Sequence, residues 1–318
     1  MTYHVPVLVD EVLAHMQLKS GGLYVDATLG GGGHSYAMLS KQANIRLIGF
    51  DQDQDAINFA SERLSEFQNQ VTIIKANFKN MRTRLALEKI NYIDGALFDI
   101  GVSNYQITNP AKGFTFMEDA DLDMRMDKDN PLTAEKIVNE YPENQLKEIF
   151  FNYGEENYSA HIAKTIIYHR NEKRISRTGE LSDIIEKSLA YLQGKHKAEV
   201  NYIKTKARIF QALRIAVNDE LGILEQSLLD AIYTLRPGSR LLVISWHSLE
   251  DRIVKNLFQR ESTDCICDKS VPQCVCKHTA LVKIISKKAI TPKEDEISVN
   301  SNARSAKLRV VEKLGRLK

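Results

Sequence analysis

The sequence has few cysteines and no long apolar run, and each scarcity excludes a class of protein. The four cysteines all lie between residues 265 and 276, too few and too local for a disulfide framework in a chain of 318 residues. No apolar stretch approaches the ~20 residues that a membrane-spanning helix needs. The first residues, MTYHVPVLVDEVL, lack a basic region ahead of an apolar one. We therefore expect no secretory signal and a soluble protein of the cytoplasm.

The remaining composition is that of an ordinary globular protein. Hydrophobic residues make up 43% and charged residues 26% of the chain, which excludes a collagen-like, disordered or coiled-coil protein. At roughly 150 residues per domain, the length allows two domains.

Charge is distributed unevenly along the chain, although the net charge is only +2. Residues 1–160 hold 14 Lys and Arg against 23 Asp and Glu, a net charge of −9, whereas residues 161–318 hold 29 against 18, a net charge of +11. The basic clusters lie at 164–177, 195–208 and 304–318. This asymmetry indicates a polyanion partner on the second half, or else solvated helix faces.

The order of β-rich and helical segments predicts an interrupted α/β sheet. Strands are expected at 23–27, 46–50, 71–75 and 95–100, with helices between them at 35–41, 54–67 and 81–89. Helical periodicity then replaces strand signals, at 144–151, 158–168, 178–192 and 206–217. After a helix and the turn Arg236-Pro237-Gly238, strands are expected at 241–245, 280–285 and 306–312. We therefore predict a Rossmann-like, mostly parallel sheet domain (1–106 and 214–318) with an inserted, mainly helical domain (107–213).

Four consecutive glycines follow the first expected strand, in the segment DATLGGGGHS (26–35). Glycine lets the backbone approach a ligand closely and offers amide hydrogens near the start of a helix. A tight turn without a ligand is the structural alternative. Such a glycine run is destabilising unless its freedom is used, which favours a nucleotide-like ligand.

An acidic residue ends the second expected strand. Asp51 follows Asp26 by about 25 residues, and in doubly wound sheets an acidic residue at this place accepts hydrogen bonds from both ribose hydroxyls. Asp53 and Asp55 are competitors in the same segment. Together with the glycine loop, Asp51 indicates a nucleoside-containing cofactor.

The cofactor is either a nicotinamide dinucleotide or S-adenosylmethionine. The dinucleotide fingerprint G-x-G-x-x-G, started from Gly30, requires a glycine where this chain has Ser35. A site for S-adenosylmethionine needs no pyrophosphate cradle but does need a polar residue after the fourth strand, and Asp99 stands there. The sequence thus favours S-adenosylmethionine.

Motifs along the whole chain resemble the bacterial small-subunit ribosomal RNA methyltransferase H family. The matching segments are HVPVL (4–8), DATLGGGGHS (26–35), FDQD (50–53), DIGVSNYQ (99–106), GFTF (113–116), LDMRMD (122–127), YGEE (153–156), FQALRIAVNDEL (210–221), ISWHSLEDRIVK (244–255) and NARSAKLRV (302–310). The resemblance implies a class I methyltransferase sheet, the cofactor S-adenosylmethionine, and methylation of the exocyclic four-position nitrogen of a decoding-region cytosine.

The resemblance also implies which residues bind the cofactor. These are Gly32, Gly33, His34, Asp51, Phe78, Asp99 and Gln106. Without the family resemblance, Phe78 would be assigned to the core. The chain departs from the pattern at Thr28, where the usual methyltransferase loop has a glycine, and at Ser103 and Asn104, where the family has paired serines. Neither departure removes a backbone amide, so we expect cofactor binding to survive both.

Methyl transfer needs orientation more than covalent chemistry. The lone pair of the cytosine amine is delocalised into the ring, and an acceptor bonded to its hydrogens would localise it. Asp99 is the expected acceptor, although the usual Asp-Pro-Pro-Tyr is replaced here by Asp-Ile-Gly-Val. The segment SWHSLEDR (245–252) adds His247 as a second candidate catalytic residue.

Several basic residues and the cysteines leave alternatives open. Phosphate contact and a structural salt bridge are both open for Arg125, Arg208, Arg214 and Arg304, with an acidic neighbour favoured for Arg125. The pairs Cys265-x-Cys267 and Cys274-x-Cys276, with His278 nearby, either enclose zinc or form a cysteine-bearing loop, since the common zinc spacing is C-x₂-C. The sequence therefore assigns no metal.

We predict an S-adenosylmethionine-dependent methyltransferase of 16S ribosomal RNA, with the insertion and the basic second half binding RNA of the 30S subunit. A non-catalytic RNA-binding assembly factor is the main alternative, and a nicotinamide oxidoreductase the other. No membrane partner is expected, and a homodimer is left open.

Overall fold

The computed structural model describes residues 6–196, 201–268, 270–271 and 273–315, without the side chains of 104, 108 and 194–196. Parts of three segments named above lie outside the described residues: HVPVL and the basic clusters at 195–208 and 304–318. The side chain of Asn104 is also outside them. The chain forms two compact units. We call Met1–Gly101 with Leu221–Lys318 the sheet unit, and Val102–Glu220 the helical unit.

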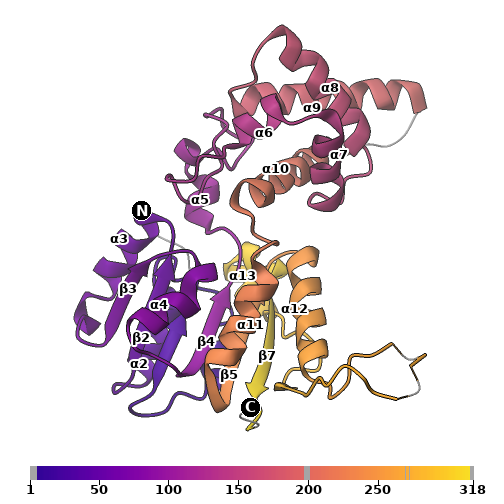
Figure 1. Cartoon of the computed structure of the whole chain (residues 1–318). Coiled ribbons are helices and arrows are strands. Elements are labelled where there is room, and N and C mark those ends of the chain that lie inside the picture. The colour runs from indigo at the N-terminus through magenta and orange to yellow at the C-terminus, as the bar shows by residue number, and fades with distance from the viewer. Residues whose placement is uncertain (1–5, 197–200, 269, 272, 316–318) are drawn as a thin grey trace. The chain divides into compact units, whose positions relative to one another are not determined.

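The sheet unit contains a seven-stranded, mostly parallel sheet in the order β3-β2-β1-β4-β5-β7-β6 (Figure 1). Its strands are β1 (Leu23–Asp26), β2 (Arg46–Asp51), β3 (Val71–Lys75), β4 (Ile93–Asp99), β5 (Leu235–Ser245), β6 (Val282–Ile284) and β7 (Lys307–Lys313). The first five are parallel, and β7 is antiparallel to both of its neighbours. The chain order reverses between β1 and β4, so this sheet has its topological switch point there.

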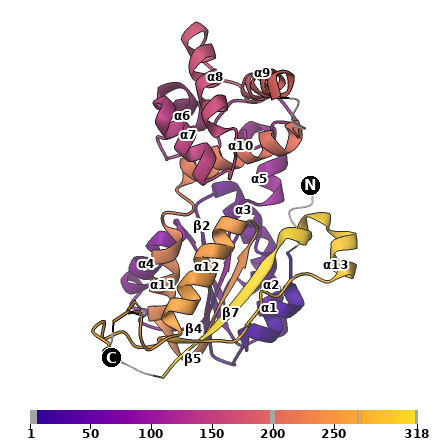
Figure 2. The same ribbon diagram turned by 90° about the vertical axis from the view of Figure 1, so that its right-hand side faces the viewer.

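Helices cover both faces of the sheet because the strands are apolar on both sides, as parallel strands require. One face carries α4 (Met81–Leu87), α11 (Leu224–Thr234) and α12 (Ser248–Glu261), packed on Val25, Phe50, Phe98 and Val243. The other face carries α1 (Val9–Met16) and α2 (Gly33–Lys41), packed on Tyr24, Leu47, Leu97 and Leu242 (Figure 2). Residues adjacent in one strand thus enter opposite cores, following the two-residue period of a strand.

The sheet unit contains two further helices and three 3₁₀ turns. These are α3 (Gln54–Arg63), α13 (Glu294–Val299), and the 3₁₀ turns η1 (Ser65–Phe67), η2 (Phe78–Asn80) and η4 (Ser301–Ser305). The η2 turn follows β3, and η4 directly precedes β7.

The helical unit has its own apolar core. Its elements are α5 (Asn104–Thr108), η3 (Pro110–Lys112), α6 (Ala134–Glu140), α7 (Glu143–Asn152), α8 (Ser159–Glu172), α9 (Thr178–His196) and α10 (Tyr202–Asn218). Phe150, Ile166, Ile185 and Leu213, from four different helices, are fully buried in this core.

The predicted fold class, a mostly parallel α/β sheet, is confirmed, while the expected division into domains stays a prediction. The expected domain boundaries, 106/107 and 213/214, fall inside α5 and α10, both of which lie whole in the helical unit. The strand expected at 241 begins at Leu235, which pairs with Ile93 before the ladder is interrupted and resumes at Arg240. Gly238, with φ +78°, lies in that interruption. Among the described residues, no helix is long and apolar enough to cross a membrane.

Candidate functional site

Three aspartates mark the carboxyl ends of neighbouring parallel strands. Asp26, Asp51 and Asp99 are the last residues of β1, β2 and β4. Ligands of open α/β sheets bind outside the carboxyl ends of the strands, at the switch point. The switch point lies between β1 and β4, so these aspartates define the candidate site.

The glycine loop joins β1 to α2 and has one open and two packed positions. Gly30 has φ +52°, and a side chain built on it would meet only the Thr28 carbonyl oxygen, at 3.9 Å. A Cβ on Gly32 would lie 3.3 Å from both the Ala60 and the Leu64 side chains. A Cβ on Gly33 would lie 2.9 Å from Pro6. Gly32 and Gly33 thus allow close internal packing, and their contact with a cofactor through backbone amides stays a prediction.

Asp51 is held by two backbone amides. Its Oδ2 accepts a hydrogen bond from Gly30 N at 2.8 Å, and its Oδ1 accepts one from Asp53 N at 2.8 Å. Burial raises the pKa of Asp51 to about 6, against the opposing effect of these two amides. Of the competing aspartates, Asp53 instead caps α3 by accepting from Asp55 N.

Ser35 contributes to the site through Asp26. Its hydroxyl donates to Asp26 Oδ2 at 2.7 Å, and the Thr28 amide donates to Asp26 Oδ1 at 3.3 Å. Burial raises the pKa of Asp26 above its usual value. The position where a dinucleotide fingerprint has glycine therefore holds a serine that bonds to a buried carboxyl.

Asp99 is oriented from several directions. Its amide donates to Thr28 Oγ1 at 2.6 Å, and its Oδ1 accepts from the Trp246 indole nitrogen at 2.9 Å. His34 Nδ1 lies 3.8 Å from Asp99 Oδ2, while His34 Nε2 lies 2.8 Å from the Val7 carbonyl oxygen. Because a carbonyl only accepts, Nε2 of His34 carries a proton, and Nδ1 faces the Asp99 carboxylate.

His247 contacts Glu250 at the start of α12. It precedes α12, and its Nε2 lies 3.0 Å from Oε1 of Glu250, whose side chain is fully buried. Glu250 Oε2 accepts from the Trp246 amide at 2.8 Å and from the His247 amide at 3.3 Å. Glu250 therefore fixes the backbone from which Trp246 reaches Asp99. The catalytic role of His247 stays a prediction.

Sequence reasoning missed the parts played by Thr28, Trp246 and Glu250. Thr28 and Trp246 follow β1 and β5, and their hydrogen bonds reach Asp99 at the end of β4, so the sequence shows only their strand-end positions. Glu250 bonds locally to the amides of Trp246 and His247, three and four residues before it, at the start of α12. The departure at Thr28 is explained by its bond to the Asp99 amide.

Phe78 and Gln106 lie in different settings. Phe78 begins η2 after β3, is partly buried against the core, and packs edge-on against Phe98 with ring centroids 5.7 Å apart. Gln106 belongs to α5 of the helical unit, where its side chain accepts from the Ser103 amide at 3.0 Å and completes a capping box with Ser103. The contact of either residue with a cofactor stays a prediction.

Comparison with known proteins assigns this fold and site to a family. The model of the MraW methylase family matches residues 1–314. The chain belongs to the MraW methylase family. A methylase on this class I sheet uses S-adenosylmethionine, which confirms the cofactor expected from the sequence and excludes the nicotinamide alternative.

Two curated relatives agree with the family match. The chain is 49% identical over 311 residues to the ribosomal RNA small subunit methyltransferase H of Carboxydothermus hydrogenoformans, covering 98% of each chain. It is 45% identical over 316 residues to the protein of the same name from Clostridioides difficile, covering 98% of this chain and 99% of the relative. A solved rRNA methylase from Streptococcus thermophilus superposes over 96% of this chain and 93% of its own, with a TM-score of 0.40 and 12% identity.

The residues present fit the cofactor of a MraW family methylase. Asp51 offers two carboxylate oxygens, enough to accept from the two ribose hydroxyls of S-adenosylmethionine. The open face of Gly30 leaves room beside it. Phe78, in the η2 turn after the next strand, has an aromatic ring of the kind that packs against an adenine.

Most arginines singled out in the sequence form ion pairs in this methylase. Arg214 makes a two-pronged contact with the buried Glu220 at 2.9 Å, and Arg208 lies 3.4 Å from the buried Glu156. Arg125 pairs with Asp123 at 2.8 Å, as favoured. Arg304 is exposed in η4, just before β7.

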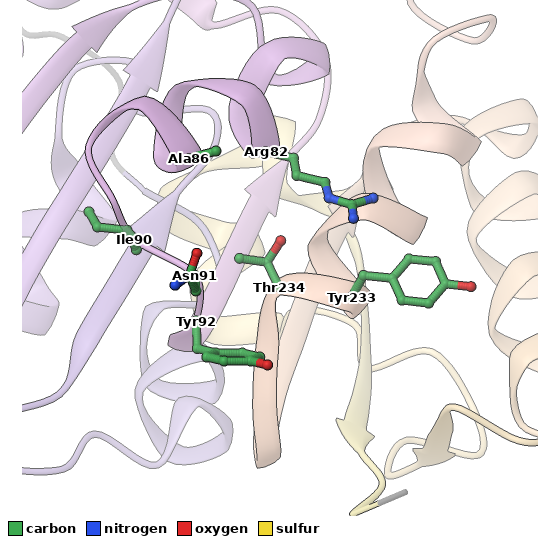
Figure 3. Close-up of a pocket in the computed structure, with 7 residues that line it drawn as sticks. All are labelled: Arg82, Ala86, Ile90, Asn91, Tyr92, Tyr233 and Thr234. Atoms are coloured by element: carbon green, nitrogen blue, oxygen red, sulfur yellow. The ribbon is translucent and has the colours of Figure 1, made fainter. Parts of the chain in front are cut away.

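A pocket of about 400 Å³ lies on the opposite edge of the methylase sheet (Figure 3). It is lined by Arg82, Ala86, Ile90, Asn91, Tyr92, Tyr233 and Thr234. Tyr92 and Thr234 immediately precede β4 and β5, so the pocket is at the amino ends of the strands. This edge is remote from the strand ends that bind ligands in such sheets.

Proposed function

We propose that this methylase modifies the exocyclic four-position nitrogen of a cytosine in the decoding region of 16S ribosomal RNA, acting on the 30S subunit in the cytoplasm. The broader activity, methyl transfer from S-adenosylmethionine to ribosomal RNA, is the activity of the family and of its named relatives. The choice of cytosine follows the sequence resemblance. The site chemistry described next supports an amine as the methyl acceptor.

The observation that carries the proposal is the fixed carboxylate of Asp99 at the carboxyl end of β4. Thr28 holds its backbone, the Trp246 indole holds Oδ1, and Oδ2 faces His34 Nδ1 at 3.8 Å. A carboxylate fixed at this strand end can accept a hydrogen bond from a substrate group that carries N–H hydrogens. The cytosine amine is such a group.

The chain's residues then prepare the amine for in-line attack. S-adenosylmethionine, when bound, supplies an electrophilic methyl group on a sulfonium sulfur. Asp99 accepts a hydrogen bond from the amine, localises its lone pair, and takes the proton released as the nitrogen–carbon bond forms. Glu250 and Trp246 keep Asp99 in place, which is how orientation lowers the barrier. In this scheme His247 is a positioning residue that acts through Glu250.

For cofactor binding, we assign Asp51 to the ribose, Phe78 to the adenine, and Gly32, Gly33, His34, Asp99 and Gln106 to the remaining contacts. Asp99 therefore lies where the amine and the cofactor meet. RNA binding is assigned to exposed lysines of the helical unit, including Lys164, Lys187 and Lys204. A homodimer stays a prediction.

Nucleoside mass spectrometry of 30S RNA treated with the enzyme tests the assignment, and we expect methylation of one cytosine amine. With saturating cofactor, Asp99→Asn should lower the single-turnover rate by about 10²–10⁴-fold. Trp246→Phe keeps the ring but removes the donor to Asp99, so it should lower the rate about tenfold. Tyr233→Phe, at the opposite edge of the sheet, is the matched control and should leave the rate unchanged.

Each outcome has a distinct meaning. Methylation of another base would refute the choice of cytosine and leave the broader activity intact. RNA binding without methyl transfer would instead support a non-catalytic assembly factor. Wild-type rates in both Asp99→Asn and Trp246→Phe would remove this pair from catalysis.

A further inference from the structure

The segment between α12 and β6 brings all four cysteines of the chain together. Cys265, Cys267, Cys274 and Cys276 lie in two Cys-x-Cys pairs, and their sulfur atoms all lie within 4.8 Å of one another. Side chains two residues apart in an extended segment point to the same side, so each pair can present both sulfurs to one centre. The methyl transfer proposed above assigns no role to this cluster.

The separations match those of thiolates around one metal ion. In a tetrahedral site with Zn–S bonds of about 2.3 Å, the sulfur atoms are about 3.8 Å apart. Here Cys274 Sγ lies 3.6 Å from Cys276 Sγ, which lies 3.9 Å from Cys265 Sγ. A disulfide needs about 2.05 Å, and all four cysteines are free thiols.

We propose that Cys265, Cys267, Cys274 and Cys276 bind one Zn²⁺ ion through four thiolates. Four sulfur ligands fill a tetrahedral shell and leave no position for substrate, so the site is structural rather than catalytic. Soft thiolate ligands select zinc over the hard cations Mg²⁺ and Ca²⁺.

Backbone amides around the cluster are arranged as the outer shell of such a site. Ile266 N and His278 N donate to Cys276 Sγ at 3.4 and 3.5 Å, and Val275 N donates to Cys267 Sγ at 3.4 Å. Hydrogen bonds of this kind orient metal ligands and stabilise the thiolate form that binds metal.

His278 is assigned to the support of the loop rather than to the metal. Its Nε2 lies 3.1 Å from the Arg260 carbonyl oxygen, at the end of α12. The same end of α12 closes the base of the loop, because Leu281 N donates to the Glu261 carbonyl at 2.8 Å. The metal would therefore fold a segment that is anchored at its base.

The apolar side chains beside the cysteines contribute little to the stability of the described part of this loop. Ile266 and Val275 beside the cysteines are 49% and 73% exposed, so they bury little apolar surface. Metal coordination substitutes for a core in segments too small to build one. Zinc would thus define the conformation of this loop.

The test is the metal content of the full-length, untagged enzyme, measured by mass spectrometry after dialysis against metal-free buffer. We expect about one zinc per chain, and X-ray absorption of the wild type should show four sulfur neighbours at about 2.3 Å. The double variant Cys274→Ser/Cys276→Ser should lose the zinc. Val275→Ser places the same new residue between these two cysteines and should keep it.

Several results would overturn the proposal. A wild-type enzyme without zinc whose four thiols react freely with a thiol reagent would show an ordinary cysteine loop. Sulfur–sulfur bonds in the intact protein would assign the cluster to redox chemistry. Nitrogen or oxygen neighbours in the absorption spectrum would refute the four-thiolate shell. Because the absorption measurement uses the wild type, it decides the question even if the double variant fails to fold.

Discussion

At the scale of single residues, the site is built from carboxyl groups whose surroundings differ. Asp26 is bonded to a serine hydroxyl, Asp51 to two backbone amides, and Asp99 to an indole nitrogen. Burial raises the pKa of Asp26 and Asp51. The sequence located Asp51 and Asp99 as site residues because each ends an apolar strand, and it placed Asp26 only at the start of the glycine segment. It did not reveal partners such as Gly30 for Asp51 and Trp246 for Asp99, which follow other strands and depend on how the sheet is assembled.

Asp51 should make cofactor binding depend on pH. Its folded-state pKa of about 6 lies above the ordinary value, so this group favours folding most below about pH 4, and that advantage over the ionised form is lost as the pH rises through 6. Accepting from two ribose hydroxyls requires the ionised form, so the binding dependence has the opposite direction. The dissociation constant for S-adenosylmethionine should rise about tenfold between pH 8 and pH 5.

Titration calorimetry across this pH range is the measurement, with Asp51→Asn as its control. The amide cannot ionise, so the variant should bind more weakly at pH 8 and lose most of the pH dependence. An equally steep profile in Asp51→Asn would assign the titration to another group, such as Asp26. A flat wild-type profile would remove the ionised Asp51 from the binding site.

At the scale of elements, the glycine loop combines two requirements that the sequence shows as one motif. The run Gly30–Gly33 predicted a close approach to a ligand, but two of its positions face the protein itself. Gly32 packs against α3, and Gly33 packs against Pro6. The local sequence could not separate these roles, because which glycine faces α3 depends on how α2 and α3 pack on the sheet.

Gly32→Ala should mainly lower the stability of the fold, whereas Gly30→Ala should mainly lower the affinity for the cofactor. Both Gly30 and Gly32 have positive φ, so each alanine costs on the order of 1–2 kcal/mol in backbone strain. Gly32→Ala adds crowding against Ala60 and Leu64 and should therefore lower the free energy of unfolding by more than Gly30→Ala does. Gly30→Ala should instead cause the larger loss of cofactor affinity, because its new methyl group occupies the open face.

Denaturant unfolding without cofactor and calorimetry with it measure the two effects separately. Equal losses of stability would show that α2 and α3 can separate at no cost. Unchanged cofactor affinity in a folded Gly30→Ala variant would place the cofactor away from this loop.

At the scale of the whole molecule, the charge asymmetry of the sequence is partly neutralised within one unit. The helical unit holds 17 Lys and Arg against 19 Asp and Glu, a net charge of −2, and the sheet unit holds 26 against 22, a net charge of +4. The basic segment after residue 160 folds back on the acidic segment before it. Arg174 pairs with Glu135, Arg177 with Asp119 and Arg208 with Glu156. A charge count along the chain cannot show such pairing, because the partners are distant in sequence.

The lysines that remain exposed on the helical unit are the better candidates for phosphate contact. Lys164, Lys187 and Lys204 lie on α8, α9 and α10 and are exposed, whereas Lys206 is mostly buried and pairs with Glu186 at 2.6 Å.

If each exposed lysine contacts one phosphate of single-stranded RNA, changing all three to glutamate should flatten the slope of log affinity against log salt by about 2. Changing Lys19, Lys41 and Lys89 of the sheet unit to glutamate alters the net charge by the same amount. This second triple variant should leave the slope nearly unchanged. Filter binding of RNA across a salt series measures both slopes. Equal slopes for the two triple variants would show that RNA responds to net charge alone, and that the helical unit makes no phosphate contacts through these lysines.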